Sequence, residues 1–571
     1  MKILFSASSF GFLRNFQSTI RLLAENGHQL HLIAERTDAI DGEKMVDGLK
    51  ADHPAIQSEF VPSSRHRLWY ALGTGVRASL DYWRYLDPKW DHSPKLRRRA
   101  AEQAPAFALA VARMPIVGTH GGLALLQRIF HAIDRVLPPP GEVADLFRRI
   151  QPDLLLLTPL LYFRSHQVDH IRCARQLGIK SILGVGSWDH LTTKGLIHEV
   201  PDRVLVWNEA QKREAMELHG VPAGRVLVTG SQAYDHWFTA RPSLDREAFC
   251  RRVGVTPGRP FLLYLCSSPF IAPHEVAFVR RWIAAIRNSV DPRVRELGLL
   301  IRPHPQNARQ WEGVDVSREF ENVGLWPRTG VNPIGGAARE DYFDSMYHAE
   351  AVVGVNTSAM IESGIIGRPV YSVTSNEFAD TQEGTLHFQH LKNVEGGLLH
   401  LAADLQVHVA QLSELVAGDG LQRQVARQFI QAFIRPHGLE IAATPLVVEQ
   451  IEHLAAAPAL VPQSDPLTAR VLRALLVPAA IIATVATMER AKLRSIVLHW
   501  TRPARLTLRA GVARLIYAGR FVRRIPRALI RLGILVFRRV VILPSRWLLH
   551  RSKMGVHAFL VWRKGEPGQI P

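Results

Sequence analysis

The sequence predicts an α/β protein in which two successive domains each contain a parallel β-sheet. The chain has 571 residues, more than one ordinary domain accommodates. Apolar runs of strand length alternate with helical patterns, a spacing that is typical of parallel strands covered by helices. The hydrophobic content of 47% and the charged content of 21% are those of a globular protein. The pattern occurs in two series, and a region of different composition follows them.

The first series begins at the N-terminus. It reads as a strand at 2–8 (KILFSAS), a helix at 17–28 that Gly27 closes, and a strand at 29–35 (QLHLIAE). The pattern resumes at 152–160, 170–187 and 202–231. We therefore expect a Rossmann-like domain at 1–240, interrupted by a helical insertion at about 63–145. The stretch 63–135 of this insertion is basic and aromatic, with 12 Lys and Arg against five acids.

The second series starts at 259–268 (RPFLLYLCSS). It continues through 297–305 (LGLLIRPHP) and 349–373, and it ends with two helical runs between 397 and 455. Residues 236–258 are rich in proline and glycine and have the composition of a linker. The sequence thus predicts a second Rossmann-like domain at 241–455.

The region 456–571 carries the excess charge of the chain. From residue 466 onward there are 21 Lys and Arg but only two acids, an excess equal to the net +19 of the full sequence. Aliphatic residues such as Val522, Leu529 and Val536 fall on one helical face, and arginines fall on the other, namely Arg520, Arg523, Arg524, Arg527 and Arg531. This pattern predicts a tail of basic amphipathic helices that lies in the interface of an anionic membrane.

Other interpretations of the tail are weaker. The basic face could belong to an ordinary core helix, but the pattern repeats from about 502 to 551 with almost no acids. Tails that bind nucleic acid are usually less aliphatic, so we expect no nucleic-acid partner. The uncharged run 474–488 has 15 residues and a proline, whereas a spanning helix needs about 20 residues. A transmembrane helix is therefore not favoured there.

Cysteine content and the N-terminus bear on the compartment. Cys173, Cys250 and Cys266 lie too far apart in the sequence for a disulfide framework or a CxxC zinc site. The start, MKILFSAS, has one lysine and a short apolar run and fits a first strand better than a signal peptide. With the basic tail, these features predict peripheral or monotopic attachment to the cytoplasmic face of the inner membrane.

The most informative stretch is 354–373 (GVNTSAMIESGIIGRPVYSV). An apolar run ends in Asn356, Thr357 and Ser358, where a helix should begin. Parallel α/β sheets bind ligands at the carboxyl ends of their strands, where helix N-termini can hold phosphate. Glu362 follows Ser358 by one helical turn, and a carboxylate there could accept both hydroxyl protons of a ribose. Taken alone, the stretch is explained equally well by a plain helix cap with an incidental Glu.

Two further strand ends carry groups that suit a phosphate. Residues 301–305 (IRPHP) supply Arg302 and His304, and residues 264–270 (YLCSSPF) supply Ser267 and Ser268. The convergence of three such ends in one sheet predicts a nucleoside-diphosphate site in the second domain.

RPHP followed about fifty residues later by GVNTSAMIESGIIGRPV resembles the C-terminal half of GT-B glycosyltransferases. The motifs resemble those of capsule and teichoic-acid polymerases of the CDP-glycerol glycerophosphotransferase type, with their His-Pro motif. Non-hydrolysing UDP-N-acetylglucosamine 2-epimerases share the two-domain plan. The resemblance covers roughly 1–455 and is strongest at 297–373. It implies a UDP-, CDP- or GDP-linked donor in the interdomain cleft, with His304, Thr357, Ser358 and Glu362 as contacts. It implies no other cofactor and no metal, and no DxD-type cluster is placed to bind one.

The N-terminal half departs from the pattern of these families. The two-glycine phosphate turn of some GT-B enzymes is missing, because SASSFGFLRNF contains only Gly11, followed by Arg14 and Asn15. This loop either faces the acceptor or donates Arg14 to the leaving phosphate. Transfer also needs a base for the acceptor hydroxyl, and the loop 184–195 offers Asp189 and His190. A loop Asp is more often a turn or cap residue.

These features together predict a glycosyltransferase or glycerophosphotransferase of surface polysaccharide or glycolipid synthesis. In this interpretation 1–240 holds a lipid-linked or membrane acceptor, 241–455 holds the nucleotide donor, and 456–571 associates with the membrane. An epimerase-like isomerase and a non-catalytic GT-B scaffold recruited by its tail are the alternatives. A soluble nucleotide-sugar substrate gives an isomerase no reason for a membrane tail, and intact His304 and Glu362 weigh against a scaffold.

Overall fold

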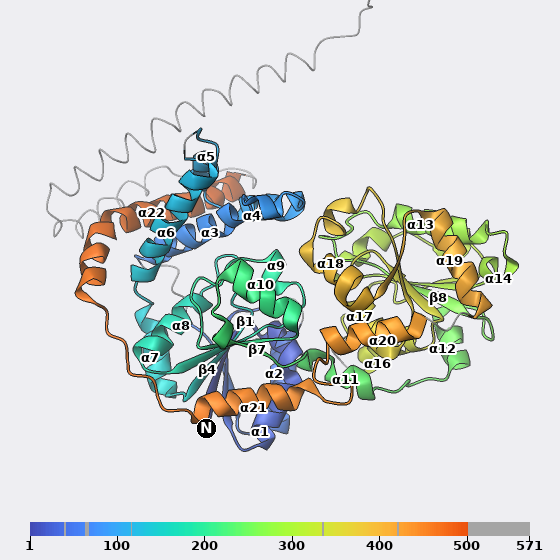
Figure 1. Cartoon of the computed structure of the whole chain (residues 1–571), viewed down its shortest axis with the longest axis horizontal. Coiled ribbons are helices and arrows are strands. Elements are labelled where there is room, and N and C mark those ends of the chain that lie inside the picture. Colours follow the sequence, from blue (N-terminus) through green and yellow to red (C-terminus); the bar gives the residue numbers. More distant parts are fainter. Residues whose placement is uncertain (39–40, 63–67, 116, 334–335, 419–421, 501–571) are drawn as a thin grey trace, which may run out of the picture. The chain divides into compact units, whose positions relative to one another are not determined.

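The computed structural model of the chain describes residues 1–38, 41–62, 68–115, 117–333, 336–418 and 422–500 (Figure 1). By their contacts the residues form two compact units. The larger unit contains both sheets and consists of Met1–Ser63, Arg77–His131 and Pro138–Ser464. The smaller unit consists of Ser64–Val76, Ala132–Leu137 and the chain from Asp465 onward.

The first sheet has seven parallel strands in the order β3-β2-β1-β4-β5-β6-β7. Its strands are β1 (Lys2–Ser9), β2 (Gln29–Arg36), β3 (Ile56–Phe60), β4 (Leu154–Thr158), β5 (Lys180–Gly184), β6 (Arg203–Val206) and β7 (Val226–Val228). The central strands β1 and β4 are almost entirely buried, as expected where helices cover a sheet on both faces. The strand order reverses between β1 and β4, which is where ligands bind in folds of this kind.

The helices of this region follow the predicted alternation with strands. They are α1 (Gln17–Glu25), α2 (Gly42–Asp52), α7 (Gly141–Ile150), α8 (Gln167–Gln176), α9 (His190–Thr193), α10 (Glu209–His219) and α11 (Asp235–Thr239), with a 3-10 helix η1 (Phe10–Phe16) after β1. The expected helical insertion lies between β3 and β4 and is confirmed. It comprises α3 (Tyr70–Arg84), α4 (Pro94–Gln103), α5 (Ala106–Ala112) and α6 (His120–Val136).

The second sheet has six parallel strands in the order β10-β9-β8-β11-β12-β13. Its strands are β8 (Phe261–Leu265), β9 (Gly298–Arg302), β10 (Val323–Leu325), β11 (Ala351–Gly354), β12 (Val370–Val373) and β13 (Leu399–Ala402). Its helices are α12 (Arg246–Val253), α13 (Val276–Arg287), α14 (Pro292–Arg295), α15 (Val316–Glu319), α16 (Gly336–Tyr347), α17 (Ala359–Ile366), α18 (Leu386–Asn393), α19 (Leu405–Ala417) and α20 (Gln422–Phe433). Its order is that of the first six strands of the first sheet, so both halves are Rossmann-like, as predicted.

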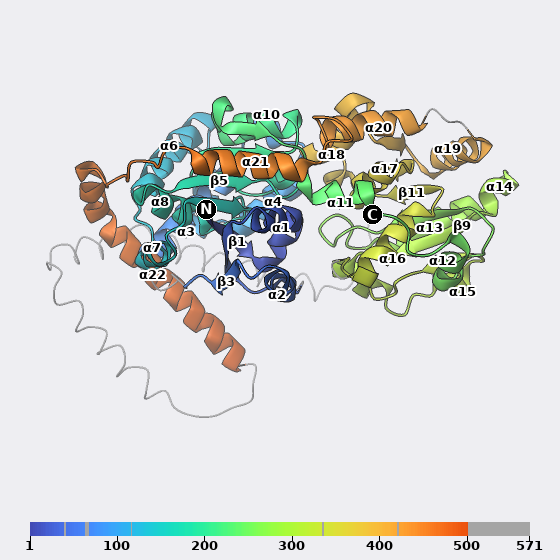
Figure 2. The ribbon, with the colours of Figure 1, turned by 90° about the horizontal axis from the view of Figure 1, so that it is seen from below.

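Two segments between and after the sheets differ from the expectation. The expected linker 236–258 contains α12, whose Phe249, Cys250 and Val253 are buried in the core of the second sheet. Helix α21 (Ala443–Ala456) returns to the first sheet, where Val447 and Ile451 share an apolar cluster with strand β1 (Figures 1 and 2). The domain limits at 240 and 455 stay a prediction, although α21, which begins inside 241–455, packs on the first sheet.

The smaller unit is dominated by α22 (Leu467–Trp500), a helix that runs through Pro478. The Thr484 hydroxyl donates to the Leu68 carbonyl at 3.1 Å, and Arg473 pairs with Asp465 within the same unit. Among the described residues, the 21-residue segment Leu467–Thr487 is long and apolar enough to cross a membrane by length and composition, which is weak support for a span. The helix is thus longer than the predicted run 474–488, and the arginines at 520, 523, 524, 527 and 531 lie outside the described residues.

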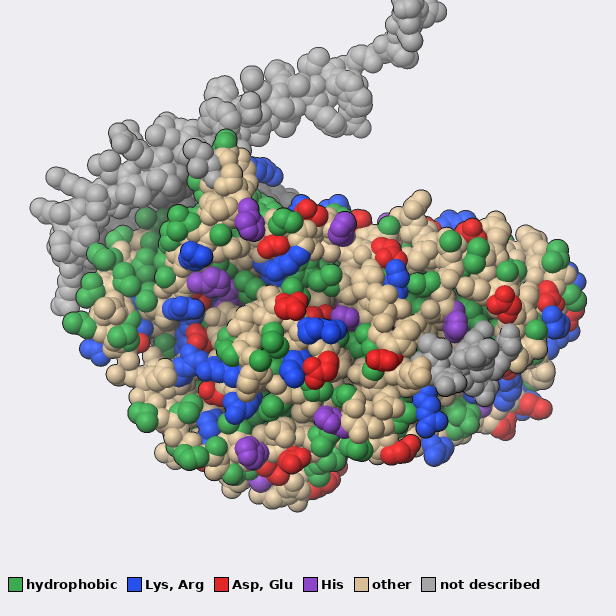
Figure 3. All heavy atoms as spheres, viewed as in Figure 1, with side chains coloured by type: hydrophobic (Ala, Val, Ile, Leu, Met, Phe, Trp, Pro, Cys, Tyr) green, Lys and Arg blue, Asp and Glu red, His purple; other side chains and the backbone are tan. Residues whose placement is uncertain are grey.

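Residues 1–465 carry balanced charge, whereas the region from 466 onward is strongly basic. On the face shown in Figure 3, acidic and basic side chains occur across the surface together. This agrees with residues 1–465, in which basic and acidic residues cancel. Electrostatic attraction to an anionic surface is therefore expected from the tail rather than from the body that contains the sheets.

Candidate functional site

The carboxyl ends of the central strands of the second sheet meet at one edge. Leu265 of β8 pairs with Arg302 of β9 and with Gly354 of β11. The loops after these three positions therefore leave the same edge, where the strand order reverses. They carry the predicted groups Ser267, Ser268, His304, Asn356, Thr357 and Ser358. The predicted convergence of the three strand ends is present, and the binding roles of these residues stay predictions.

Two neighbouring cavities open at this edge. The aromatic cavity, of about 340 Å³, is lined by Arg14, Tyr234, Trp237, Tyr342 and Glu362 together with the shared residues below. The basic cavity, of about 730 Å³, is lined among others by Lys95, Arg98, Arg99, Asp189, Lys194 and His387. Both cavities are lined by Ser187, His304, Gln306, Thr357 and Ser358. The shared residues mean that ligands in the two cavities would lie next to each other.

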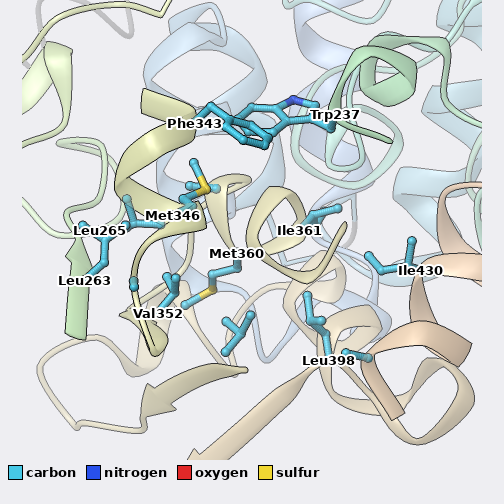
Figure 4. Close-up of a cluster of buried hydrophobic side chains, with 14 of the residues drawn as sticks. Trp237, Leu263, Leu265, Phe343, Met346, Val352, Met360, Ile361, Leu398 and Ile430 are labelled. Atoms are coloured by element: carbon cyan, nitrogen blue, oxygen red, sulfur yellow. The ribbon is translucent and has the colours of Figure 1, made fainter. Parts of the chain in front are cut away.

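Helix α17 is held by apolar packing on its buried side, and this packing fixes its first turn next to the cavities. Met360 and Ile361 point into the apolar cluster that also holds Val352 and Leu398 (Figure 4). At the start of the helix, Ser358 occupies the N-cap position, is exposed and makes no side-chain cap hydrogen bond. A plain capping role therefore does not account for Ser358, and its hydroxyl is available to a ligand.

Glu362 lines the aromatic cavity one turn further along α17. The Tyr342 hydroxyl donates a hydrogen bond to Glu362 Oε2 at 2.6 Å. Burial raises the pKa of Glu362 to about 7, although Tyr342 and Arg14 favour its charged form. The charge of this carboxyl group therefore changes close to neutral pH.

His304 lines both cavities and is held in one tautomer. Its Nδ1 accepts a hydrogen bond from the Gln306 backbone N–H at 3.1 Å, which assigns the ring proton to Nε2. Burial, with a smaller effect from Arg14, lowers the pKa of His304 to about 4. The imidazole is therefore neutral at pH 7, and its Nε2–H is a donor suited to a phosphate oxygen.

The two candidate arginines differ in how they are paired. Arg302 donates to Asp341 Oδ2 at 2.9 Å and to Ser345 Oγ at 2.7 Å, so its charge is balanced inside the protein. Arg14 is exposed at the aromatic cavity and forms no ion pair with any residue that the structure describes. Arg14, rather than Arg302, is thus the cation available to an anionic ligand.

The remaining strand-end residues divide between the cavity and its support. Ser268 lines the basic cavity, whereas Ser267 is buried and its backbone N–H donates to Glu275 Oε2 at 2.7 Å. Burial raises the pKa of Glu275 to about 7. Asn356 lines the basic cavity, where its Nδ2 donates to the Thr381 carbonyl at 2.5 Å. Ser267 and Glu275 therefore fix the loop that presents Ser268.

The loop after β1 contributes one ligand-facing cation and two residues held by the protein. The Gly11 N–H donates to Asp38 Oδ2 at 2.6 Å, and Gly11 lines neither cavity. Asn15 lines the aromatic cavity, but its Nδ2 donates to the Gly186 carbonyl at 2.6 Å. The loop therefore presents Arg14 from a backbone that Gly11 and Asn15 hold in place.

Asp189 and His190, the two candidate bases, occupy different positions. Asp189 lines the basic cavity and accepts from Ser187 Oγ at 2.6 Å and Thr193 Oγ1 at 2.8 Å. Burial is the largest single influence and opposes ionisation, but Lys194 (3.6 Å away), His190, His387 and the Ser187 hydrogen bond together outweigh it and hold the pKa of Asp189 well below its usual range. His190 is buried and lines neither cavity, and burial lowers its pKa to about 4.

Sequence reasoning missed several residues of the site. Tyr342 lies on α16 and His387 on α18, and neither follows a strand, so the strand-end rule does not find them. The cations Lys95, Arg98 and Arg99 lie on α4, in the stretch 63–135 that is basic and aromatic in sequence. Their density was a usable signal, but the cavity they line was not visible without the structure.

Two Rossmann-like sheets in one chain, with a site at their switch-point edges, define an α/β protein with the two-domain GT-B plan. No protein-family model matches the chain. No curated protein matches it either.

Several solved structures are similar in fold. A UDP-GlcNAc 2-epimerase from Methanocaldococcus jannaschii is 12% identical, with a TM-score of 0.46, and the match covers 80% of this chain and 100% of the other. A glycosyltransferase from Rickettsia africae is 9% identical (TM-score 0.45, covering 80% and 99%), and MurG from Acinetobacter baumannii is 11% identical (TM-score 0.39, covering 79% and 99%). At these TM-scores the similarities carry no argument about activity, and the fold assignment rests on the strand order itself.

Proposed function

We propose that the chain is a glycosyltransferase that moves a sugar, or glycerol phosphate, from a nucleotide-activated donor to an acceptor in the adjoining cavity. The observation that carries the proposal is the meeting of His304, Ser358 and Glu362 at one aromatic cavity. A neutral Nε2–H donor, an uncommitted hydroxyl at a helix start and a carboxylate are the groups that a diphosphate and a ribose require.

Each group has a specific role in this proposal. Glu362 accepts the protons of the ribose hydroxyls, and its contact with Tyr342 fixes the orientation of the carboxylate. The Ser358 hydroxyl and His304 Nε2–H donate to the phosphate oxygens. Arg14 balances the negative charge that grows on the leaving phosphate as the bond to the transferred group breaks.

Transfer forms a bond from an acceptor oxygen to the donor group and breaks the bond from that group to the phosphate oxygen. The leaving nucleotide takes the electron pair, and the acceptor hydroxyl gives up its proton. We assign the proton to Asp189 because it lines the basic cavity, whereas His190 is buried and lines neither cavity. The low pKa of Asp189 makes it a weak base, so the assignment rests on its position. That no metal is needed stays a prediction, which activity in excess EDTA would test.

The presence of a second cavity favours transfer over isomerisation. An isomerase acts on one nucleotide-sugar and needs a single site, whereas the basic cavity is the larger of the two and shares His304 and Ser358 with the aromatic one. A second substrate in that position would meet the donor at its reactive end. A scaffold without activity has no need for either site.

Nucleotide binding tests the proposal. Melting curves of the full chain with UDP, CDP, GDP, CMP and ADP should show stabilisation by one of them, because a ligand of the native state raises the apparent Tm. His304→Ala and Glu362→Ala should abolish that shift, whereas Glu217→Ala, at an exposed position on α10, should keep it. The absence of a shift with every nucleotide would contradict the proposal and favour the scaffold alternative.

The same proposal places the chain at the cytoplasmic face of the inner membrane, where a lipid-linked acceptor resides. Its support is the net +19 of the region from 466 onward and the apolar, mostly exposed segment Leu467–Thr487. Deleting 466–571 should abolish pelleting with anionic vesicles and leave a body of near-neutral charge. Undiminished pelleting of the truncated chain would move the membrane contact to the insertion at 63–145.

A further inference from the structure

The basic cavity holds more cations than acids. Its cationic side chains are Lys95, Arg98 and Arg99 on α4 and Lys194 after β5, and its acidic side chains are Glu102 and Asp189. Asp189 pairs with Lys194 at 3.6 Å. Within the part of the chain that the structure describes, none of the three α4 cations forms an ion pair. The wall formed by α4, with three cations and Glu102, therefore presents a net positive charge to the cavity.

The Phe270 ring holds two of these cations, Lys95 and Arg99, in position. Lys95 Nζ lies 4.9 Å from the centroid of the Phe270 ring, and the Arg99 guanidinium lies 5.0 Å from the same centroid. On the opposite face of the helix, Leu96 and Ala100 are buried in a cluster with Trp90. A cation that is already ordered loses less conformational entropy when it binds a ligand.

The helical insertion is fastened to the loop that carries Asp189. Arg84, at the end of α3, is buried and donates to the carbonyls of Leu191 at 2.8 Å and Gly195 at 3.0 Å. The Tyr85 hydroxyl donates to the Lys194 carbonyl at 2.7 Å. The candidate base and the α4 cations therefore belong to one connected wall of the cavity.

Burial and the mutual repulsion of the positive charges in the basic cavity both lower the pKa of its lysines. Burial lowers the pKa of Lys194, and Arg99 lowers it further while Asp189 opposes the shift. Burial likewise lowers the pKa of Lys95, with Asp380 opposing the shift and Arg98 adding to it. A bound anion would relieve this repulsion, as in other clusters of basic residues that recognise phosphate or carboxylate.

We infer that the basic cavity is an acceptor subsite that binds an anionic group, a phosphate, diphosphate or carboxylate, through Lys95, Arg98 and Arg99. The inference rests on the proposed function, because it assigns the aromatic cavity to the donor. A donor diphosphate held at His304 and Ser358 leaves the α4 wall to a second ligand. The acceptor would thus carry its negative charge close to the hydroxyl that Asp189 deprotonates.

Titration with inorganic pyrophosphate tests the subsite on the full chain. The triple variant Lys95→Gln, Arg98→Gln, Arg99→Gln should bind pyrophosphate at least about tenfold more weakly than the unmodified chain, because charge-assisted contacts are lost. The matched control is Lys89→Gln, Arg113→Gln, Arg128→Gln, which removes three exposed charges of the insertion that line neither cavity. Equal affinity in both triple variants, or no binding by the unmodified chain, would overturn the inference.

Further arms separate folding, donor binding and the source of the anion. If the triple variant does not fold, the single variant Arg98→Gln replaces it, because Arg98 is exposed and its loss should not disturb the fold. Weaker binding of pyrophosphate by Arg98→Gln then supports the subsite, and unchanged binding contradicts it. The nucleotide-induced Tm shift should persist in the triple variant, because the donor groups are unchanged. If the unmodified chain and all variants show no such shift, the proposed function is wrong. The pyrophosphate result then decides the anionic subsite on its own. Tighter binding of farnesyl diphosphate than of pyrophosphate would indicate a lipid diphosphate acceptor, and competition by glucuronate would indicate an acidic sugar.

Discussion

The two sheets share one strand order, yet the loops at their carboxyl ends differ in kind. In the second sheet, some polar atoms at the strand ends lack protein partners: Asn356 Oδ1 and the neighbouring His387 Nδ1 are buried without a hydrogen bond from any described residue, and Ser358 makes no cap hydrogen bond. In the first sheet, Gly11, Asn15 and Asp189 are bonded within the protein, whereas His190 Nδ1 and Ser231 Oγ are exceptions among the described residues.

This difference shows how one topology serves two ligands. The second sheet keeps the Ser358 hydroxyl and His304 Nε2–H available to a ligand, which suits the recognition of phosphate and ribose. The first sheet uses its polar groups to hold loops and a helical insertion, and this assembly contributes Arg14, Asp189 and the α4 cations. We therefore expect changes in the second half to act on donor binding and changes in the first half to act on the acceptor and on chemistry.

The largest expected effect comes from Asp189 in the first half. Asp189→Asn should lower kcat by roughly 10²-fold, the lower end of the usual range for a general base, because the acceptor hydroxyl loses a base whose pKa is low. Donor affinity should stay within about twofold, since the donor groups belong to the second sheet. Steady-state kinetics and nucleotide titration measure the two quantities, with the melting temperature checking that the unpaired Lys194 is tolerated. If His190→Asn loses kcat to this extent and Asp189→Asn does not, His190 is the base and the assignment of Asp189 is wrong.

The pH dependence of donor binding is expected to be smaller and to depend on the second half. With its pKa raised to about 7, Glu362 is mostly protonated at pH 6 and mostly ionised at pH 8. Only the ionised form accepts both ribose protons, so affinity for the nucleotide should rise by up to about tenfold across this range. Glu362→Gln should remove this rise and retain only the contribution of the ligand's own ionisation. Titration at several pH values checks both.

Tyr342→Phe sharpens the same prediction. The Tyr342 hydroxyl donates to the ionised carboxylate, so its removal should raise the pKa of Glu362 further and move the affinity midpoint to higher pH. An unchanged midpoint would mean that the titrating group is not Glu362.

Much of the fold followed from local sequence patterns. Apolar runs such as KILFSAS and RPFLLYL have the length of strands buried on both faces, and the helices between them fix parallel pairing and hence the edge at which the strand ends meet. The convergence of Ser268, His304 and Ser358 could therefore be predicted without any coordinates.

The rest depends on contacts between distant segments. Tyr342 precedes Glu362 by 20 residues on another helix, and Phe270 meets Lys95 and Arg99 across an even longer sequence separation. The prediction for 236–258 failed for a related reason, because the apolar residues of α12 were outweighed by the flanking Pro and Gly signals. Pairing within the protein also separates Arg302 from Arg14, a distinction that residue type does not reveal.

The smallest expected effect compares the two helix starts directly. Asn208 caps α10 in the first half: its Oδ1 accepts from Gln211 N at 2.9 Å and its Nδ2 donates to the Phe433 carbonyl at 2.8 Å. Asn208→Ala should therefore lower the free energy of unfolding by about 1–2 kcal/mol. Ser358→Ala should change it by less than about 0.5 kcal/mol, because Ser358 makes no cap hydrogen bond. Ser358→Ala should weaken nucleoside-diphosphate binding by about fivefold, whereas Asn208→Ala should not. Denaturant unfolding measures the stability of both variants, and nucleotide titration measures their affinity. A Ser358→Ala variant that loses stability but no affinity would show that Ser358 is an ordinary helix cap.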